Sequence, residues 1–241
     1  MGGIWILLLL ILTAALPVIL VFFWFRARNL AVTLPWFLVS LAAGIISLFA
    51  AALVQNRLPF PGGDGPGGLG VIFFGVFIRV ALVEEASRLL TLFPLIKAAS
   101  RRKTIDSTFG AALGLVAGFG FAALENAFYG VADINITLLR IFSAAPLHGA
   151  CGIRAGAAVF IAKQRPLKAL GLFISCVIMH GAYNLMIVSP ALPSILAVLI
   201  AFAALFASLS FIKTPEEGGR HGNQFSKVKE NVKNKGWEGK K

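Results

Sequence analysis

Long hydrophobic runs alternate with short polar stretches along almost the whole of this chain. Each run is long enough for a helix to cross the ~30 Å hydrocarbon core of a bilayer, which takes about 20 residues. The approximate bounds of the runs are 4–25, 31–54, 71–98, 109–130, 136–162, 169–189 and 192–212. The pattern therefore predicts an all-α fold, a polytopic membrane helix bundle of about seven transmembrane helices within residues 1–212.

The composition favours a membrane protein over a soluble one. Of the 241 residues, 58% are hydrophobic and 13% are charged, which leaves too few polar side chains to cover a soluble domain. The net charge of +12 would suit a nucleic-acid partner, but Lys and Arg lie between the apolar runs and in the C-terminal tail. We therefore expect a lipid bilayer, and no nucleic acid, around this chain.

The positions of the basic residues predict the orientation of the chain in the membrane. Arg26 and Arg28, the clusters at 97–103 and 163–168, and the tail at 213–241 follow alternate runs, so all would lie on one side. The positive-inside rule places that side in the cytoplasm. We expect a multi-pass protein of the cell membrane with its N-terminus outside and a basic, disordered, cytoplasmic C-terminal tail.

The third run carries an unusual number of charges for a membrane helix, namely Arg79, Glu84, Glu85 and Arg88. Each of them costs roughly 2.5 to 3.5 kcal/mol to insert into a bilayer. Arg88 follows Glu84 by four residues and Glu85 by three, so it can pair with either carboxylate. Such pairing could simply hold a bundle together, whereas four charges in one helix favour a functional site.

Each of the next three runs combines polar residues with small ones at helical spacing. The stripes are Gly110, Gly114, Gly118 and Glu125 in the fourth run, His148, Gly152 and Gly156 in the fifth, and Cys176, His180 and Asn184 in the sixth. Small residues at this spacing allow close helix packing, but packing needs no carboxylate or imidazole. The candidate catalytic residues are Glu84, Glu85, Glu125, His148, His180 and Asn184, with Arg88 and Asn126 in support and Arg79, Arg140 and Arg154 nearby.

In this order, the residues resemble the motif series of the PrsW family of intramembrane proteases, which is related to the CAAX-processing and bacteriocin-protection proteases. The similarity lies in a motif core at 71–190 and consists of Glu84-Glu85-x-x-Arg88, Phe121-x-x-x-Glu125-Asn126, His148 in a Gly-rich helix, and His180-x-x-x-Asn184. The family usually has Lys where this chain has Arg88. The CAAX-type relatives have His at the position of Glu125, where this chain resembles PrsW.

The resemblance implies a membrane-embedded peptidase that hydrolyses peptide bonds of membrane-associated proteins, for example by site-1 cleavage of a membrane-anchored regulator. Glutamate and histidine side chains would then activate the attacking water. One of Glu84 and Glu85 would be the general base, and the other would orient it or serve as a second acid. Asn184, one turn from His180, could donate a hydrogen bond to the oxyanion of the tetrahedral intermediate.

The sequence leaves the cofactor open. His148, His180 and Glu85 could supply the three protein ligands of a catalytic zinc site, and relatives have been classed as metalloproteases. The chain has no His-Glu-x-x-His motif, and the CAAX-type relatives resemble metal-independent glutamate enzymes. We favour a site with no tightly bound metal over one with a divalent metal such as zinc.

Two other classes of protein could carry the same residues. A proton-coupled transporter or relay also uses intramembrane Glu and His, but the two halves of this chain show no inverted repeat and no matching broken helices. A scaffold with inherited motifs would have lost some of them, and here the set is complete apart from the change of Lys to Arg. We therefore favour the protease.

Overall fold

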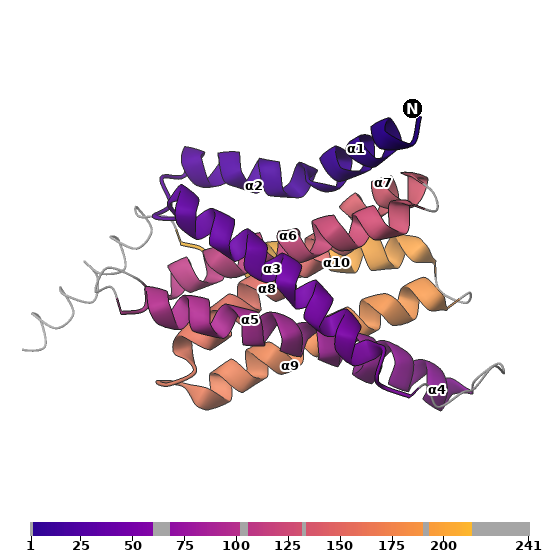
Figure 1. The fold of residues 1–241 in the computed structure, drawn as a ribbon. Helices are drawn as coiled ribbons and strands as arrows, with labels where there is room; N and C mark the ends of the chain where they lie inside the picture. Colours follow the sequence, from indigo (N-terminus) through magenta and orange to yellow (C-terminus); the bar gives the residue numbers. More distant parts are fainter. Residues whose placement is uncertain (1, 60–67, 102–105, 132–133, 190–192, 214–241) are drawn as a thin grey trace, which may run out of the picture.

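A computed structural model describes residues 2–59, 68–101, 106–131, 134–189 and 193–213, and in these ranges it contains helices and no strand (Figure 1). The predicted all-α fold is thereby confirmed. The predicted tail lies outside the described residues, apart from Lys213. The elements are α1 (Gly2–Ala14), α2 (Leu16–Ala27), α3 (Leu34–Gln55), α4 (Leu69–Phe73), the π-helix η1 (Phe74–Leu82), α5 (Val83–Ala99), α6 (Ser107–Gly130), α7 (Ile134–Phe142), α8 (Ala144–Ile161), α9 (Pro166–Val188) and α10 (Ser194–Leu209).

Four of the described helices, α3, α6, α8 and α9, are long and apolar enough to cross a membrane. A fifth span results if α1 and α2 are counted as one bent helix. The apolar part of α10 is shorter, and the third predicted run is divided among α4, η1 and α5. The count of seven spans and the sides of the two termini therefore stay predictions.

Three of the predicted runs are interrupted. α1 and α2 meet at a bend of 43°, and Pro17 lies in the first turn of α2, where a missing N–H is tolerated. The fifth run, expected as one helix, is broken at Ser143 into α7 and α8. In the third run, the nine residues of η1 end just before the first turn of α5, which carries Glu84 and Glu85. π-helical turns are rare and often occur at functional sites.

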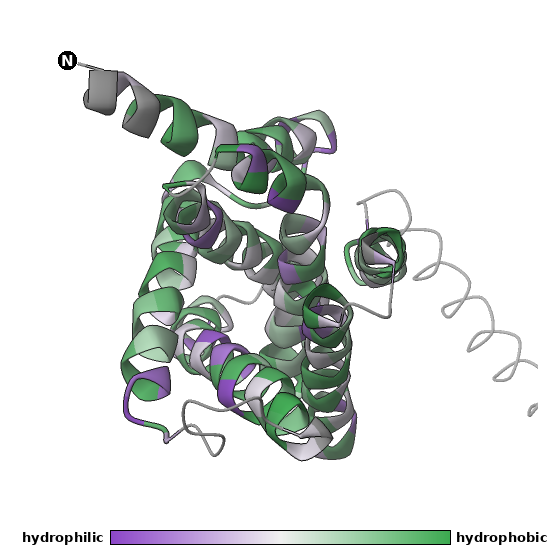
Figure 2. Ribbon diagram, turned by 90° about the vertical axis from the view of Figure 1, so that its right-hand side faces the viewer, coloured by the Kyte–Doolittle hydropathy of each residue, from purple (hydrophilic) through white to green (hydrophobic). Residues whose placement is uncertain are grey.

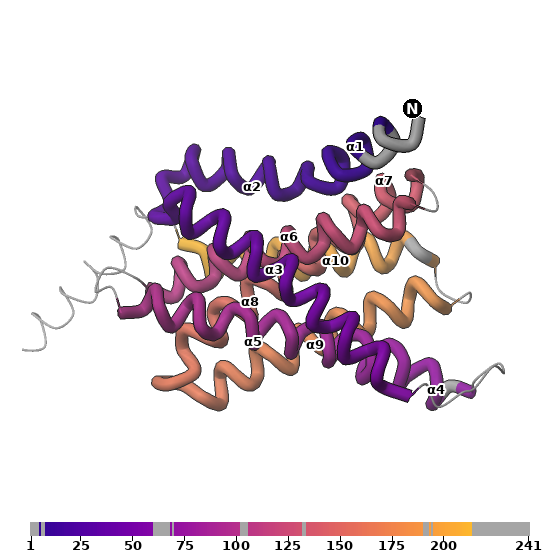
Figure 3. Tube along the Cα trace, viewed as in Figure 1, coloured from indigo at the N-terminus to yellow at the C-terminus, as the bar shows by residue number. Residues whose placement is uncertain are grey.

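The centre of the bundle is the contact between α6 and α8, which are the most buried of the four long helices. A Cβ atom at Gly114 would overlap the carbonyl group of Gly152, and one at Gly118 would overlap that of His148. The glycine stripes thus let the two backbones touch, in keeping with the predicted close packing. This contact places the backbone of His148 against α6. α3 runs diagonally across α5 and α6, as the trace in Figure 3 shows.

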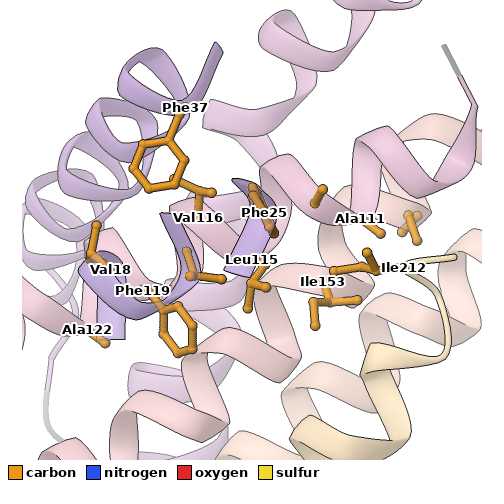
Figure 4. Packing of buried hydrophobic residues seen from close by; sticks show 14 of the residues in the cluster. Val18, Phe25, Phe37, Ala111, Leu115, Val116, Phe119, Ala122, Ile153 and Ile212 are labelled. Atoms are coloured by element: carbon orange, nitrogen blue, oxygen red, sulfur yellow. The ribbon is translucent and has the colours of Figure 1, made fainter. Parts of the chain in front are cut away.

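Apolar side chains fill the space between the helices and also cover the outside of the bundle. Figure 4 shows Phe25 and Phe37, from α2 and α3, beside Leu115 and Phe119 of α6 in the largest core cluster. In Figure 2, hydrophobic residues predominate along the coloured helices of the bundle. Large apolar side chains that are well exposed, such as Leu90 at 70%, suit a surface that faces lipid.

Candidate active site

Five helices bring ionisable side chains from distant parts of the sequence into one buried network. α5 and α6 contribute its three carboxylates, and α8 and α9 contribute its two imidazoles, whose ring centroids lie 5.0 Å apart. All but one of the predicted catalytic residues belong to this network. Its members are Glu84, Glu85 and Arg88 on α5, Glu125 on α6, Arg140 on α7, His148 on α8 and His180 on α9.

Glu85 has both of its carboxylate oxygens engaged. Oε2 forms an ion pair with Nη1 of Arg88, and Oε1 lies 2.7 Å from Nδ1 of His180. All three side chains are almost completely buried. Because an ionised carboxylate only accepts hydrogen bonds, Nδ1 of His180 carries the proton and donates it. In the neutral ring, Nε2 of His180 therefore keeps its lone pair.

Arg88 joins the glutamate pair to the second histidine. Its Nη2 atom lies 3.0 Å from Nδ1 of His148, and its Cζ atom lies 4.7 Å from the centroid of the Phe121 ring. A guanidinium group can only donate, so Nδ1 of His148 must accept. The proton of the neutral imidazole is then on Nε2, which lies 2.9 Å from Oε2 of Glu125 and donates to it. The contacts thus fix the tautomers of both histidines.

The same oxygen of Glu125 also pairs with Arg140, which the sequence placed near the site without a role. Nη2 of Arg140 lies 2.6 Å from Oε2 of Glu125, and its Nε atom donates to Oδ1 of Asn126 at 2.8 Å. The guanidinium also lies over the ring of Tyr129, 4.1 Å from its centroid. The sequence signal for Arg140 was a charged residue within an apolar run. Only the fold shows that its partner is Glu125.

Glu84 differs from Glu85 because one of its oxygens has no hydrogen-bond partner among the described residues. Oε1 accepts from Nε2 of Gln55 at 3.1 Å, whereas Oε2 is buried and lies 3.6 Å from Nε2 of His180. That separation is too long for a hydrogen bond. The backbone of Gln55 is fixed as well, because its backbone carbonyl oxygen accepts a hydrogen bond from Nη2 of Arg79 at 3.0 Å. No sequence signal indicated Gln55, an uncharged residue at the end of α3.

The two asparagines of the predicted site have different surroundings. Asn126 is fully buried and contacts Arg140, while its backbone oxygen accepts from the hydroxyl of Thr137 at 2.9 Å. It therefore supports Arg140 instead of contacting the α5 carboxylates. Asn184 is partly exposed, one turn beyond His180, and its side chain forms no hydrogen bond within the described part of the chain. It is the one predicted catalytic residue that the network does not include.

The donor atoms of Glu84, His148 and His180 fit a three-ligand metal site. One ligand atom from each lies within 4.8 Å of the others, and Oε2 of Glu84 is a buried acceptor without a partner. Each imidazole gives one nitrogen to a carboxylate and keeps a lone pair on the other, as in carboxylate–histidine–metal arrangements. Nη2 of Arg88 donates to Nδ1 of His148, so a metal ion and the guanidinium group would compete for the lone pair of that nitrogen. Glu85, named as a ligand from the sequence, groups instead with Cys151 and Cys176.

Comparison with known proteins gives one family. The family described as PrsW family intramembrane metalloprotease matches residues 32–209 of the chain. The match includes every member of the buried network. No curated protein and no solved structure gives a significant match.

Replacing Arg88 tests the pairing in the network. Arg88→Leu leaves Glu85 and His148 buried without their donor, so we expect the free energy of unfolding to fall by about 3 to 5 kcal/mol. Glu85→Gln combined with Arg88→Leu removes both charges and should restore part of the loss. Thermal denaturation in detergent provides the measurement, with exposed Arg101→Leu as the control. An Arg88→Leu protein as stable as this control would contradict the pairing.

Proposed function

The chain belongs to the PrsW family of intramembrane metalloproteases, and on this premise we propose that its buried Glu and His network hydrolyses peptide bonds of membrane-anchored proteins. The observation that carries the proposal is the contrast between the two adjacent glutamates. Glu85 is saturated by Arg88 and His180, whereas Glu84 keeps a free oxygen beside a free imidazole nitrogen. A water molecule in contact with both atoms would have two groups able to take its proton.

We assign the general base to Glu84 and an orienting role to Glu85. Oε2 of Glu84 is a buried carboxylate oxygen with no hydrogen-bond partner among the described residues, so it can take a proton from water. Glu85 holds Nδ1 of His180 and so directs Nε2 toward Glu84. The imidazole of His180 is then placed to receive that proton and deliver it to the leaving amine.

The remaining residues position groups and stabilise charge. Glu125 and Arg88 hold the ring of His148 from its two sides, and Arg140 fixes Glu125. Asn184 is assigned as a donor to the oxyanion, because its amide lies one turn from His180 and makes no hydrogen bond with other described residues.

The same residues allow a metal-assisted form of the reaction. Glu84, His148 and His180 would hold a divalent ion such as zinc, with Glu85 and Glu125 orienting the two imidazoles. Such an ion would act as a Lewis acid on the scissile carbonyl group.

The substrate is proposed to enter from the end of the bundle that carries α7. Glu125 and Arg140 are the most exposed members of the network, at 16% and 15%, whereas the side chains of the others are at most 7% exposed. The described N-terminal helix α1 lies beside α7 (Figure 1), and the charge pattern predicts that this end faces outward. A regulator anchored in the cell membrane, cleaved near its extracytoplasmic end, suits this geometry.

One contact weighs against a proton relay as the function. Direct contacts between described side chains connect Glu85 to His148 through the guanidinium of Arg88. Arginine stays protonated in proteins and cannot take up and release protons along such a path. The network therefore suits local proton transfer at one bond better than conduction across the bilayer.

Glu84→Gln should lower proteolysis by about 10²- to 10⁴-fold, because an amide cannot serve as the base. The measurement is a quantitative comparison of membrane proteins from cells with the wild-type and variant chains, in which the uncleaved substrate accumulates. Asp106→Asn is the matched control, because it also changes a carboxylate to an amide, at an exposed helix N-cap that amides fill equally well. Equal cleavage by Glu84→Gln and Asp106→Asn would refute the role of Glu84.

Metal binding can be measured without activity. If zinc is held by Glu84, His148 and His180, titration calorimetry of the purified protein should show one tight site that His180→Ala weakens by at least about 10- to 100-fold. Cys176→Ser serves as the control, because Cys176 belongs to the other group of ligand atoms. The ligand set is wrong if Cys176→Ser weakens binding and His180→Ala does not.

A further inference from the structure

One end of the bundle collects most of the described cations. This is the end at which α2, α5 and α8 finish and α6 and α9 begin, opposite α7 in Figure 1. Asp106, which caps α6 through the backbone nitrogen of Phe109, is the carboxylate described there. The cations at this end are Arg26, Arg28, Lys97, Arg101, Lys163, Arg165, Lys168 and Lys213.

A cavity of about 400 Å³ opens at this basic end, between α6, α8, α9 and the segment that follows α10. Its rim carries Gln164, Arg165 and Lys168, while its inner walls are apolar and include Leu172 and Phe211. Neither cation of the rim has an ion pair with any residue that the structure describes. The cavity thus combines a positive mouth with a hydrophobic interior.

An intramembrane arginine lies one helical turn deeper than the cavity wall. Arg154 lies on α8, three positions before the lining residue Ala157. On the neighbouring segments, Ser175 follows the lining residue Leu172 by three positions, and Ser208 precedes the lining residue Phe211 by three. Nε of Arg154 donates to the hydroxyl of Ser208, and Nη1 donates to that of Ser175, each at 2.9 Å. Both partners are neutral, so no described carboxylate compensates a charge that is expensive to keep in a bilayer.

We propose that this cavity binds an anionic phospholipid. The phosphate would lie at the mouth between Arg165 and Lys168, where the opposite charges attract each other. An acyl chain would cover the apolar wall, which a small free anion would leave in contact with water. The positive charge of Arg154 beneath the wall adds to the preference for a negative headgroup. The site lies apart from the catalytic network and does not depend on the proposed proteolysis.

The test uses the full-length protein in nanodiscs of phosphatidylcholine, with or without phosphatidylglycerol. Native mass spectrometry counts the phosphatidylglycerol molecules that stay bound, and thermal denaturation reports the stabilisation. Arg165→Gln with Lys168→Gln should lower retention of this lipid by about tenfold or more, because it removes both cations of the cavity mouth where the phosphate would bind. Arg26→Gln with Arg28→Gln removes the same charge at the same end, outside the cavity, and should leave retention unchanged.

Two results would overturn the proposal. If both double variants lose phosphatidylglycerol equally, the protein attracts anionic lipid by its overall charge and not at this cavity. If glycerol 3-phosphate, added without any lipid chain to the phosphatidylcholine nanodiscs, stabilises the protein as much as phosphatidylglycerol, the ligand is a free phosphate. Retention that depends on the cavity pair and requires the acyl chain supports the site.

Discussion

The rest of the structure depends on the guanidinium of Arg88, which is buried in the middle of a membrane bundle. Such a charge is tolerated only where acceptors surround it, and here Glu85 and His148 supply them from two different helices. Glu85 in turn contacts His180, and His148 contacts Glu125. One cation therefore sets the relative positions of α5, α6, α8 and α9, and the catalytic groups are held as a by-product of its pairing.

Backbone geometry makes this arrangement possible. The glycines of α6 and α8 remove the side chains that would keep the two helices apart, so the first turns of α8 pack directly against α6. The π-helix η1 ends just before α5 and contacts α9, the helix that carries His180. As a result, Glu84 and Glu85 have different partners: both carboxylate oxygens of Glu85 are paired, whereas Oε2 of Glu84 has no hydrogen-bond partner among the described residues. Unequal environments for two adjacent carboxylates are a general way to obtain an acid–base assignment from identical side chains.

The sequence predicted the parts of this picture that follow from periodicity and from the cost of buried charge. Apolar runs predicted helices, and glycine spacing predicted close helix packing without identifying the partner helices. Ionisable residues within apolar runs predicted the members of the network apart from Arg140. Gln55 and Arg140 could not be assigned, because their roles depend on which helices become neighbours. Periodicity also missed the break at Ser143, since α7 and α8 are both apolar. The local signal was Pro146 in the first turn of α8, which has no N–H and crowds the carbonyl group of Phe142, the last residue of α7. The unequal roles of Glu84 and Glu85 likewise required contacts from other helices.

The central claim is that this chain alone hydrolyses a peptide bond of a membrane-anchored protein. The most direct measurement reconstitutes the purified protein with a candidate single-span substrate in lipid vesicles prepared in H₂¹⁸O, followed by mass spectrometry of the products. Hydrolysis by activated water predicts fragments whose new C-terminal carboxylate contains solvent oxygen, formed by the wild-type chain and not by a His180→Ala variant. The claim would be contradicted if the purified wild-type chain left the substrate intact, while cells that contain the wild-type chain cleaved the same substrate.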